Sequence, residues 1–375
     1  MPCLYIEILI IIGRSRNLRI ESLINFVKEN NEIDAGLIFG TNNRFYFSDA
    51  STSEGLLFTD SKSAYLLVDS RYFEYCKNTV KDCEVILVTD LQKQLKDLVE
   101  YCNCKKIAVD ISEIDVAQFE YFRTIIKPAQ LLSDGTLNDF ILKTRAIKDA
   151  KELKNIEESQ KLLDLGYEYI LKTVKTGITE TELSFKLFVF LKEHGAQDVS
   201  FDFIVLSGEN TSKPHGMPGK REIKYGDLIL LDFGVKVNGY CSDMTRTFAI
   251  GEATTQQKEI YNLVLSAQES AIKQLKPEVP CKEIDKIARD IIKKGGFEAE
   301  FGHSLGHSLG LNIHEDPILS PKSDDVTKPN MVFTVEPGIY LTGKFGIRIE
   351  DTVFVTQNGC KNITKSPKSE LLIVK

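Results

Sequence analysis

The chain has 375 residues, of which 42% are hydrophobic and 27% charged, and its formal net charge is −7. This length suggests two or three domains, and the composition is that of an ordinary globular protein, which excludes disordered, collagen-like and fibrous classes. The negative net charge argues against nucleic acid or an anionic membrane as the main partner, because proteins that bind either one present a basic surface. Eight scattered cysteines without a Cys-x-x-Cys pair indicate reduced thiols and a cytoplasmic protein, and they give no support to a zinc ribbon or a thioredoxin-type site.

The amino-terminal residues resemble neither a membrane anchor nor a secretory signal. The apolar run Leu4–Ile12 is interrupted by Glu7 and is far shorter than the ~20 residues of a membrane-spanning helix. Three arginines follow this run, whereas a secretory signal carries its basic residues before the apolar region. We expect residues 1–18 to form a leading strand or a loosely attached extension.

The first part of the chain alternates short apolar runs with helical patterns. An amphipathic helix begins at Ile20, and the remaining expected elements are buried strands at Ala35–Phe39, Ala64–Val68, Glu84–Val88 and Lys106–Val109 and helices at Leu91–Cys102 and Asp115–Ile126. This alternation predicts an α/β domain with some parallel pairing that ends near Leu132. It contains no histidine, so we expect a scaffold or a substrate-gating role.

Beyond the turn at 133–135 longer charged helices are expected together with strand-like segments. The helices are Asp149–Lys175 (apolar at Leu153, Ile156, Leu163, Leu165 and Ile170), a helix that starts at a capping signal at Thr179 and runs to about Glu193, and about Gln256–Leu275 and Glu283–Lys294. We place the boundary between residues 135 and 145, which gives domains 1–140 and 141–375.

Four of the five histidines fall within one hundred residues, together with acids inside strongly apolar strands. These residues are His215, His303, His307 and His314, with Asp232, Asp243, Glu336 and Glu350. For one histidine alone, a structural or surface role is the default interpretation. The clustering with four acids favours a functional site instead.

The first two acids can be placed by geometry. Asn238-Gly239 is a strong two-residue hairpin turn that follows an apolar strand. With this turn Val237 opposes Tyr240 and Asp232 opposes Thr245, so Asp232 and Asp243 become diagonal neighbours on one face.

Two carboxylates that lie close together among leucine and isoleucine cannot both stay ionised without a partner. Either one takes up a proton, as in an aspartic-protease-like pair, or a cation lies between them. The nearby histidines and glutamates favour a metal. The remaining alternative is that both acids are exposed hairpin positions.

The second pair of acids follows similar logic. Glu336 and Glu350 each end an apolar strand, but the turn at 342–345 does not define the register, so their facing is an inference. Pro337 interrupts the strand directly after Glu336, an irregularity of the kind found beside sites.

His303 and His307 are four residues apart, but glycines at 302, 306 and 310 argue against a helix, and the His-Glu-x-x-His zinc motif is absent. On an extended chain the two histidines would share a face. The tripeptide Asp232-Phe-Gly also occurs in kinases, but no glycine-rich loop or His-Arg-Asp loop accompanies it.

With these residues in place, the chain resembles the pita-bread metallopeptidases. The order Asp232, Asp243, His307, Glu336, Glu350 is similar to their five-ligand signature, and the surrounding segments, including Leu-Asp-Phe-Gly, Gly-His-Ser-Leu-Gly-Leu-Asn-Ile-His-Glu and Thr-Val-Glu-Pro-Gly-Ile-Tyr, resemble the aminopeptidase P and prolidase branch. The likeness covers about residues 145–375. It implies a creatinase/prolidase-like α/β amino-terminal domain followed by an α+β pita-bread catalytic domain. Ser308 departs from the family pattern, and residues 1–18 have no obvious counterpart.

The resemblance implies two divalent ions, with Mn²⁺ preferred and Co²⁺ or Zn²⁺ as alternatives. Asp243 and Glu350 would bridge the ions, Asp232 would complete one coordination shell, and His307 with Glu336 would complete the other. Two ions about 3.5–4 Å apart acidify a bridging water and stabilise a tetrahedral intermediate. The attacking group would thus be a metal-bridging hydroxide.

The resemblance also implies substrate roles. His215 and His314 would contact the substrate carbonyl and the intermediate, and Glu336 would pass a proton to the leaving proline nitrogen. His303 and Arg348 would line the pocket or hold other site groups in place, and a simple ion pair with neighbouring acids is the alternative for Arg348.

The expected activity is that of a cytoplasmic Xaa-Pro aminopeptidase, a dinuclear exopeptidase that acts on peptides with proline at the second position. The resemblance to the family also implies a homodimer. The aminopeptidase is preferred because the sequence has no obvious insertion that would bind the carboxylate of a substrate ending in proline. A prolidase that cleaves Xaa-Pro dipeptides is the first alternative. A metal-free pita-bread binding protein, a creatinase-like hydrolase and a structural metal-binding protein are further alternatives, against which the five intact ligand positions count.

Overall fold

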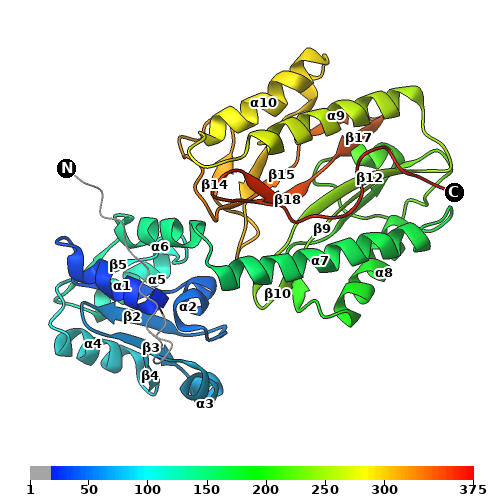
Figure 1. Cartoon of the computed structure of the whole chain (residues 1–375). Helices are drawn as coiled ribbons and strands as arrows, with labels where there is room; N and C mark the ends of the chain where they lie inside the picture. The colour runs from blue at the N-terminus through cyan, green and yellow to red at the C-terminus, as the bar shows by residue number, and fades with distance from the viewer. Residues whose placement is uncertain (1–17) are drawn as a thin grey trace. The chain divides into compact units, whose positions relative to one another are not determined.

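The computed structural model describes residues 18–375 and divides the chain into two compact units, Met1–Ile141 and Leu142–Lys375 (Figure 1). The extension expected at residues 1–18 lies outside the described residues except for Leu18, which begins the first helix. The expected order of an α/β unit followed by an α+β unit is confirmed.

The first unit is built on one mixed sheet of six strands in the order β4-β3-β2-β1-β5-β6. The pairs β1–β5, β5–β6 and β3–β4 are parallel, while β1–β2 and β2–β3 are antiparallel, which confirms the prediction of some parallel pairing. The strands are β1 (Ala35–Ile38), β2 (Leu56–Asp60), β3 (Ala64–Val68), β4 (Glu84–Leu87), β5 (Lys106–Val109) and β6 (Gln130–Leu132).

Helices cover both faces of this sheet. Leu37 and Phe58 belong to the same core as Leu95 of α4 and Phe122 of α5, whereas Gly36 points to the opposite face, where Leu137 of α6 approaches. The helices are α1 (Leu18–Glu29), α2 (Thr41–Ser48), α3 (Ser70–Thr79), α4 (Leu91–Tyr101), α5 (Val116–Ile125) and α6 (Thr136–Ala146), the last of which continues into the second unit. The sequence patterns did not predict β2, β6, α2, α3 and α6.

The second unit has two pairs of helices with strands between them, α7 and α8 on one side and α9 and α10 on the other (Figure 1). Asp149, Thr179 and Thr254 begin α7, α8 and α9 with capping boxes, in which the side chain accepts a backbone N–H three residues on. The bounds are α7 (Ala150–Thr173), α8 (Glu180–Glu193), α9 (Thr255–Gln274) and α10 (Cys281–Lys294). Leu165, expected among the apolar positions of α7, is 44% exposed because it falls on the outer face of the helix.

The strands that carry the site lie inside this second unit. They are β8 (Ile204–Ser207), β9 (Leu228–Phe233), β10 (Val235–Val237), β11 (Tyr240–Cys241), β12 (Met244–Ile250), β13 (Gly306–Ser308), β14 (Glu315–Leu319), β15 (Val332–Val335), β16 (Gly338–Leu341), β17 (Phe345–Arg348) and β18 (Asp351–Val355). Short strands β7 (Asp198–Val199), β19 (Cys360–Asn362) and β20 (Ile373–Val374) and 3₁₀ turns at Gly208–Ser212 and Glu298–Glu300 complete the unit.

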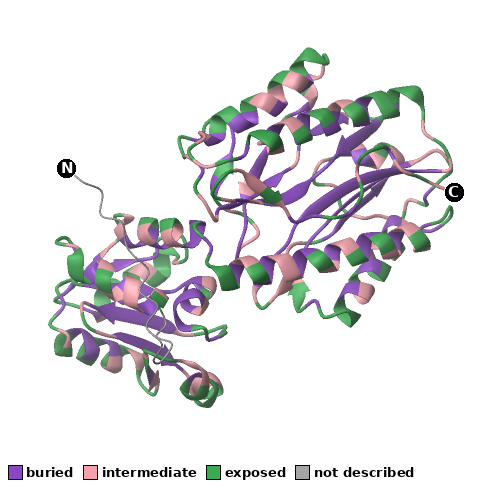
Figure 2. Cartoon of the chain, in the orientation of Figure 1, coloured by how far each residue is buried: buried purple, intermediate pink, exposed green. Residues whose placement is uncertain are grey.

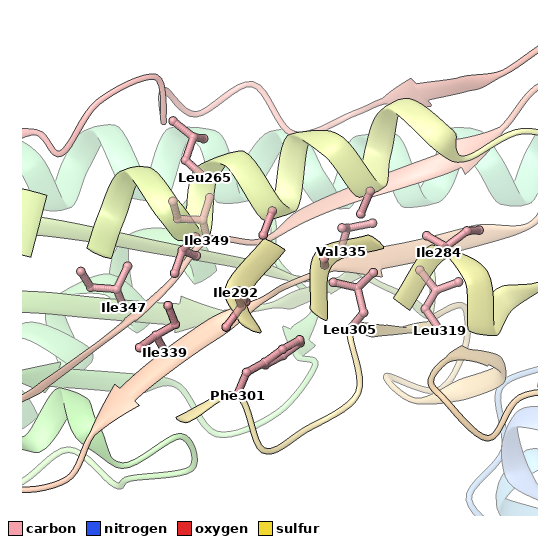
Figure 3. Packing of buried hydrophobic residues seen from close by; sticks show 14 of the residues in the cluster. Leu265, Ile284, Ile292, Phe301, Leu305, Leu319, Val335, Ile339, Ile347 and Ile349 are labelled. Carbon is pink, nitrogen blue, oxygen red and sulfur yellow. The ribbon is translucent and has the colours of Figure 1, made fainter. Parts of the chain in front are cut away.

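Apolar side chains from the helices and from these strands form the cores that hold the strands in place. Figure 2 shows the strands of both units buried and the outer helix faces exposed. In Figure 3, Leu265 of α9 and Ile284 and Ile292 of α10 belong to the same buried cluster as Val335, Ile339 and Ile347. Among the helices of the described region, none combines the length and the apolar character needed to cross a bilayer.

Candidate metallopeptidase site

The first two predicted ligands lie on the hairpin that the sequence indicates. Asn238 and Gly239 have φ of 50° and 82°, as the tight turn requires, and Val237 pairs with Tyr240 while Asp232 pairs with Thr245. The predicted register is therefore confirmed. Asp232 is 8% exposed and Asp243 is 5% exposed, so the alternative of two exposed hairpin positions is wrong.

Glu336 lies in the break between β15 and β16, and Glu350 lies in the break between β17 and β18. Val335 pairs with Asp351 on one side of the gap, and Gly338 pairs with Arg348 on the other, so the same register continues across the break at Pro337. Glu336 and Glu350 thus lie opposite one another, in the place where the ladder is interrupted. The turn that the sequence could not define spans residues 342–344, with Gly343 at a φ of 73°.

His307 lies on β13, an extended segment and not a helix, as the neighbouring glycines predicted. Its Nδ1 is 3.0 Å from the carbonyl oxygen of Ser308, and its Nε2 is 3.6 Å from Asp243 Oδ2 and 3.5 Å from Glu336 Oε1. A proton held on Nδ1 by this carbonyl leaves the Nε2 lone pair directed at the acids. Gly306 is required here, since a Cβ at this position would lie 2.0 Å from the carbonyl oxygen of Thr334.

The predicted ligands show the features of a cation site. Asp243, His307 and Glu350 each offer a ligand atom within 4.8 Å of the others. Within residues 18–375, Asp232 Oδ1, Asp243 Oδ1 and Glu350 Oε1 are buried without a hydrogen-bond partner. Buried carboxylate oxygens without donors are costly unless a cation compensates them, and oxygen ligands with one imidazole suit a divalent ion. The residues therefore fit a bound metal.

The pKa shifts of the acids have the same origin. Burial, and then repulsion from Glu350 and Asp232, raise the pKa of Asp243 well above its ordinary value. Burial, and then repulsion from Glu336 and Asp232, do the same for the pKa of Glu350. Burial raises the pKa of Glu336 to about 7, although Arg348 opposes this shift. Without a cation, these groups retain protons at pH values where exposed acids are ionised.

Arg348 joins the acids to a buried tyrosine. Its Nη2 donates to Asp232 Oδ2, its Nη1 donates to the hydroxyl of Tyr340 at 2.7 Å, and its Nε donates to Thr245 Oγ1 at 3.0 Å. The ion pair considered for Arg348 is therefore present, but it reaches Asp232 across the strands and not the adjacent Glu350. Arg348 is 3% exposed, so it forms a fixed part of the site.

Three polar residues that the sequence patterns did not single out support the acids. Tyr340 binds Arg348 and also lies with its hydroxyl 3.0 Å from His303 Nε2. Thr245 donates to Glu350 Oε2 at 2.7 Å, and Thr334 donates to Glu336 Oε1 at 3.1 Å. Tyr340 belongs to one of the segments that carry the resemblance, and Thr245 is the hairpin partner of Asp232, but neither position signals these contacts in the sequence.

The other predicted histidines surround the acids to different degrees. His314 meets the ring of His307 edge-on, with centroids 4.5 Å apart, and burial followed by the charge of His215 lowers its pKa. Burial, and then the charge of Arg348, lower the pKa of His303 to about 4. His215 is exposed in the loop that follows the 3₁₀ turn at Gly208–Ser212, and it is close enough to influence both rings. His194, to which the sequence gave no role, stacks on Phe190 at the end of α8.

Comparison with known proteins agrees with this arrangement. The family described as Metallopeptidase family M24 matches residues 154–357, and the family described as Creatinase/Prolidase N-terminal domain matches residues 19–147. The chain is 34% identical to the Xaa-Pro dipeptidase of Pyrococcus horikoshii over 353 residues, which cover 94% of this chain and 98% of that protein.

Solved structures show the same fold. The Xaa-Pro dipeptidase from Bacillus anthracis is 36% identical with a TM-score of 0.91, and the match covers 95% of this chain and 99% of that one. The X-Pro aminopeptidase from Thermotoga maritima MSB8 is 35% identical with a TM-score of 0.86, over 91% of this chain and 98% of that one. The predicted creatinase-like unit followed by a pita-bread unit is thereby confirmed, and the chain belongs to metallopeptidase family M24.

Proposed function

We propose that this protein hydrolyses the peptide bond between an amino-terminal residue and a following proline, at a site that holds two divalent ions. The observation that carries this proposal is the convergence of three buried, unpartnered carboxylate oxygens beside the free Nε2 of His307. An arrangement of this kind has a high energetic cost unless cations occupy it. The names of relatives that align over more than nine-tenths of the chain support the proline-directed chemistry.

In this proposal Asp232, Asp243, His307, Glu336 and Glu350 would together hold the two ions. Mn²⁺ is the proposed ion because the ligand set is dominated by oxygen, with Co²⁺ and Zn²⁺ as alternatives. When bound, such ions acidify water and polarise a carbonyl group.

The protein side chains would do the remaining work. Glu336 would pass a proton toward the leaving proline nitrogen. His314, next to His307, and His215 would donate hydrogen bonds to the substrate carbonyl. His303, whose ring is anchored to Tyr340, would line the pocket for the substrate. Arg348 would fix the orientation of Asp232.

A dedicated site is useful because the Xaa-Pro bond is a tertiary amide. It has no N–H, and the ring fixes the backbone angle, so an enzyme that relies on that N–H cannot align it. A site that anchors the free amino group and packs against the ring still can.

The length of the substrate separates two candidates. The sequence favoured an aminopeptidase, and the Thermotoga maritima neighbour carries that name. The names of the relatives from Pyrococcus horikoshii and Bacillus anthracis favour the dipeptidase alternative. We propose dipeptides as the preferred substrates and keep the aminopeptidase as the second candidate.

The deciding experiment compares an Xaa-Pro dipeptide with the matched Xaa-Pro-Xaa tripeptide and with an Xaa-Ala dipeptide, using the Mn²⁺-loaded protein. The proposal expects the highest kcat/KM for the Xaa-Pro dipeptide. A preference for the tripeptide would establish the aminopeptidase instead. Equal rates on Xaa-Ala would contradict proline specificity. The homodimer and the cytoplasmic location stay predictions.

A further inference from the structure

Three buried charged residues lie beside the site without belonging to it. Arg145, in the last turn of α6, and Lys148, just before α7, both contact the carboxylate of Glu315, the first residue of β14. The side chains of Arg145, Lys148 and Glu315 are 6%, 1% and 7% exposed. Lys148 Nζ lies 3.3 Å from Glu315 Oε2 and also donates to Ser308 Oγ at 3.1 Å.

These contacts reach both ends of the loop that connects β13 and β14. Ser308 directly follows His307, and Glu315 directly follows His314. Lys148 therefore binds a neighbour of each histidine with one ammonium group. Arg145 also donates to Asn312 Oδ1 at 3.0 Å, within the loop, and the backbone N–H of Asn312 donates to Glu315 Oε1 at 3.1 Å.

The interior of the loop leaves little free space around this carboxylate. A Cβ built on Gly310 would lie 2.7 Å from Glu315 Oε2, so the glycine is needed where the carboxylate fills the loop. The carbonyl of Gly310 also accepts the backbone N–H of Cys241 at 2.7 Å, which ties the loop to the hairpin that carries Asp243. The loop is thus fixed at both ends and in its middle.

In this cluster, burial and ion pairing act in opposite directions on the pKa values of Lys148 and Glu315. Burial lowers the pKa of Lys148, although Glu315 opposes that shift. Burial acts to raise the pKa of Glu315, but Lys148 and Arg145 together hold this pKa below its ordinary value. Buried ionic groups are a weak source of stability compared with apolar side chains of the same shape, whereas they can specify one geometry. A buried ionic cluster beside two site histidines therefore suggests a role in positioning.

We propose that Lys148 and Arg145, through Glu315 and Ser308, are positioning residues that set the place of His314 relative to His307. This inference rests on the proposed function, in which His314 contacts the substrate. The rings of the two histidines are 4.5 Å apart, so a small shift of the loop changes where His314 meets a substrate carbonyl. The cluster itself touches no reacting atom.

Two variants test this inference without leaving an uncompensated buried charge. Lys148→Met removes the contact with Ser308 and leaves the pair between Arg145 and Glu315. Gly310→Ala keeps every charge but pushes against the carboxylate of Glu315. Ile260→Val, in the buried face of α9, is the control for a general loss of packing.

The first readout is kinetic, on the metal-loaded protein with an Xaa-Pro dipeptide. Lys148→Met and Gly310→Ala should lower kcat by about 10- to 100-fold, with a smaller change in KM, because a small misplacement of a group that acts on the transition state has an effect of this size. Ile260→Val should keep kcat within about twofold of the unmodified protein.

The second readout is independent of activity. Histidine ¹⁵N spectra of the Zn²⁺-loaded protein should show a shifted His314 signal in both test variants and an unshifted one in Ile260→Val, with the signal assigned by its loss in His314→Gln.

Unchanged kcat and His314 signal in the two test variants would overturn the inference. If Lys148→Met does not fold, Gly310→Ala decides. If the unmodified protein cleaves no Xaa-Pro peptide, the proposed function fails, and the spectra still decide the positioning role.

Discussion

His307 Nε2 lies 3.6 Å from Asp243 Oδ2, at the point where β13 approaches the start of β12. This separation is too long for a hydrogen bond, and burial lowers the pKa of His307 to about 4, so the ring is neutral near pH 7. A neutral imidazole that points a lone pair toward a buried acid gains nothing from that acid alone. A cation between the two groups would satisfy both.

Removing one of the proposed ligand acids should remove both metal and activity. We expect Asp243→Asn and Glu350→Gln to bind fewer than the two divalent ions proposed for the unmodified protein and to lose hydrolysis of Xaa-Pro peptides. Metal content by mass spectrometry of the purified proteins and a peptidase assay check this. Asp164→Asn is the control, because Asp164 binds backbone amides near residue 366 and lies outside the ligand set. Full activity of the chelated, metal-free protein would contradict the mechanism.

Thr245 should matter through its hydroxyl group. It donates to Glu350 Oε2 and accepts from Arg348 Nε, so it fixes a proposed ligand. Thr245→Val should weaken metal affinity by about 10- to 100-fold, the usual effect of losing a partner of a ligand. Thr245→Ser keeps the hydroxyl and should retain most of the affinity. Titration calorimetry with Mn²⁺ measures both, and equal affinities for the two variants would show that the hydroxyl has no such role.

The hydroxyl of Tyr340 connects His303 to Arg348 and should affect catalysis as well as stability. Tyr340→Phe removes the hydroxyl that pairs with the buried His303 Nε2 and Arg348 Nη1, so it should lower the free energy of unfolding by about 1–3 kcal/mol. We also expect kcat/KM to fall by about tenfold or more, because Arg348 orients Asp232.

Tyr261→Phe is the matched control for this change. It also removes a buried hydroxyl, one that donates to the carbonyl of Lys368 away from the site. It should lower stability and leave kcat/KM unchanged. Equal losses of activity in the two variants would mean that Tyr340 acts only through the stability of the fold.

The stability of the protein should depend on pH through His303. Its pKa is lowered to about 4, below the ordinary value near 6.5, so folding favours the neutral ring. This contribution is present above pH 6.5 and is lost as the pH falls toward 4. The free energy of unfolding of the unmodified protein, relative to His303→Gln, should therefore drop by about 2 kcal/mol between pH 7.5 and pH 5. Chemical denaturation at both pH values measures this, and a constant difference would show that His303 is protonated like an exposed histidine.

Local patterns are enough for part of the site. The turn at Asn238-Gly239 defines the register of its hairpin by itself, since only a few residues are involved, and this register places Asp232 beside Asp243. Most of the predicted helices begin at capping residues that act on their own backbone, such as Thr179, and these are local interactions too. The strand β2 and the helix α2 were missed because their sequences lack a clear period.

The chain by itself thus determined the types of ligand, their order and one pair of neighbours. Only the tertiary structure places Glu336 opposite Glu350. The turn at 342–344 is compatible with several registers, and the packing of the strands selects one of them. The tertiary structure also decided the contacts of Tyr340 and of Lys148 with residues distant in sequence. Such contacts form only when the apolar cores bring separate elements together, and the residues concerned carry no local pattern that records them.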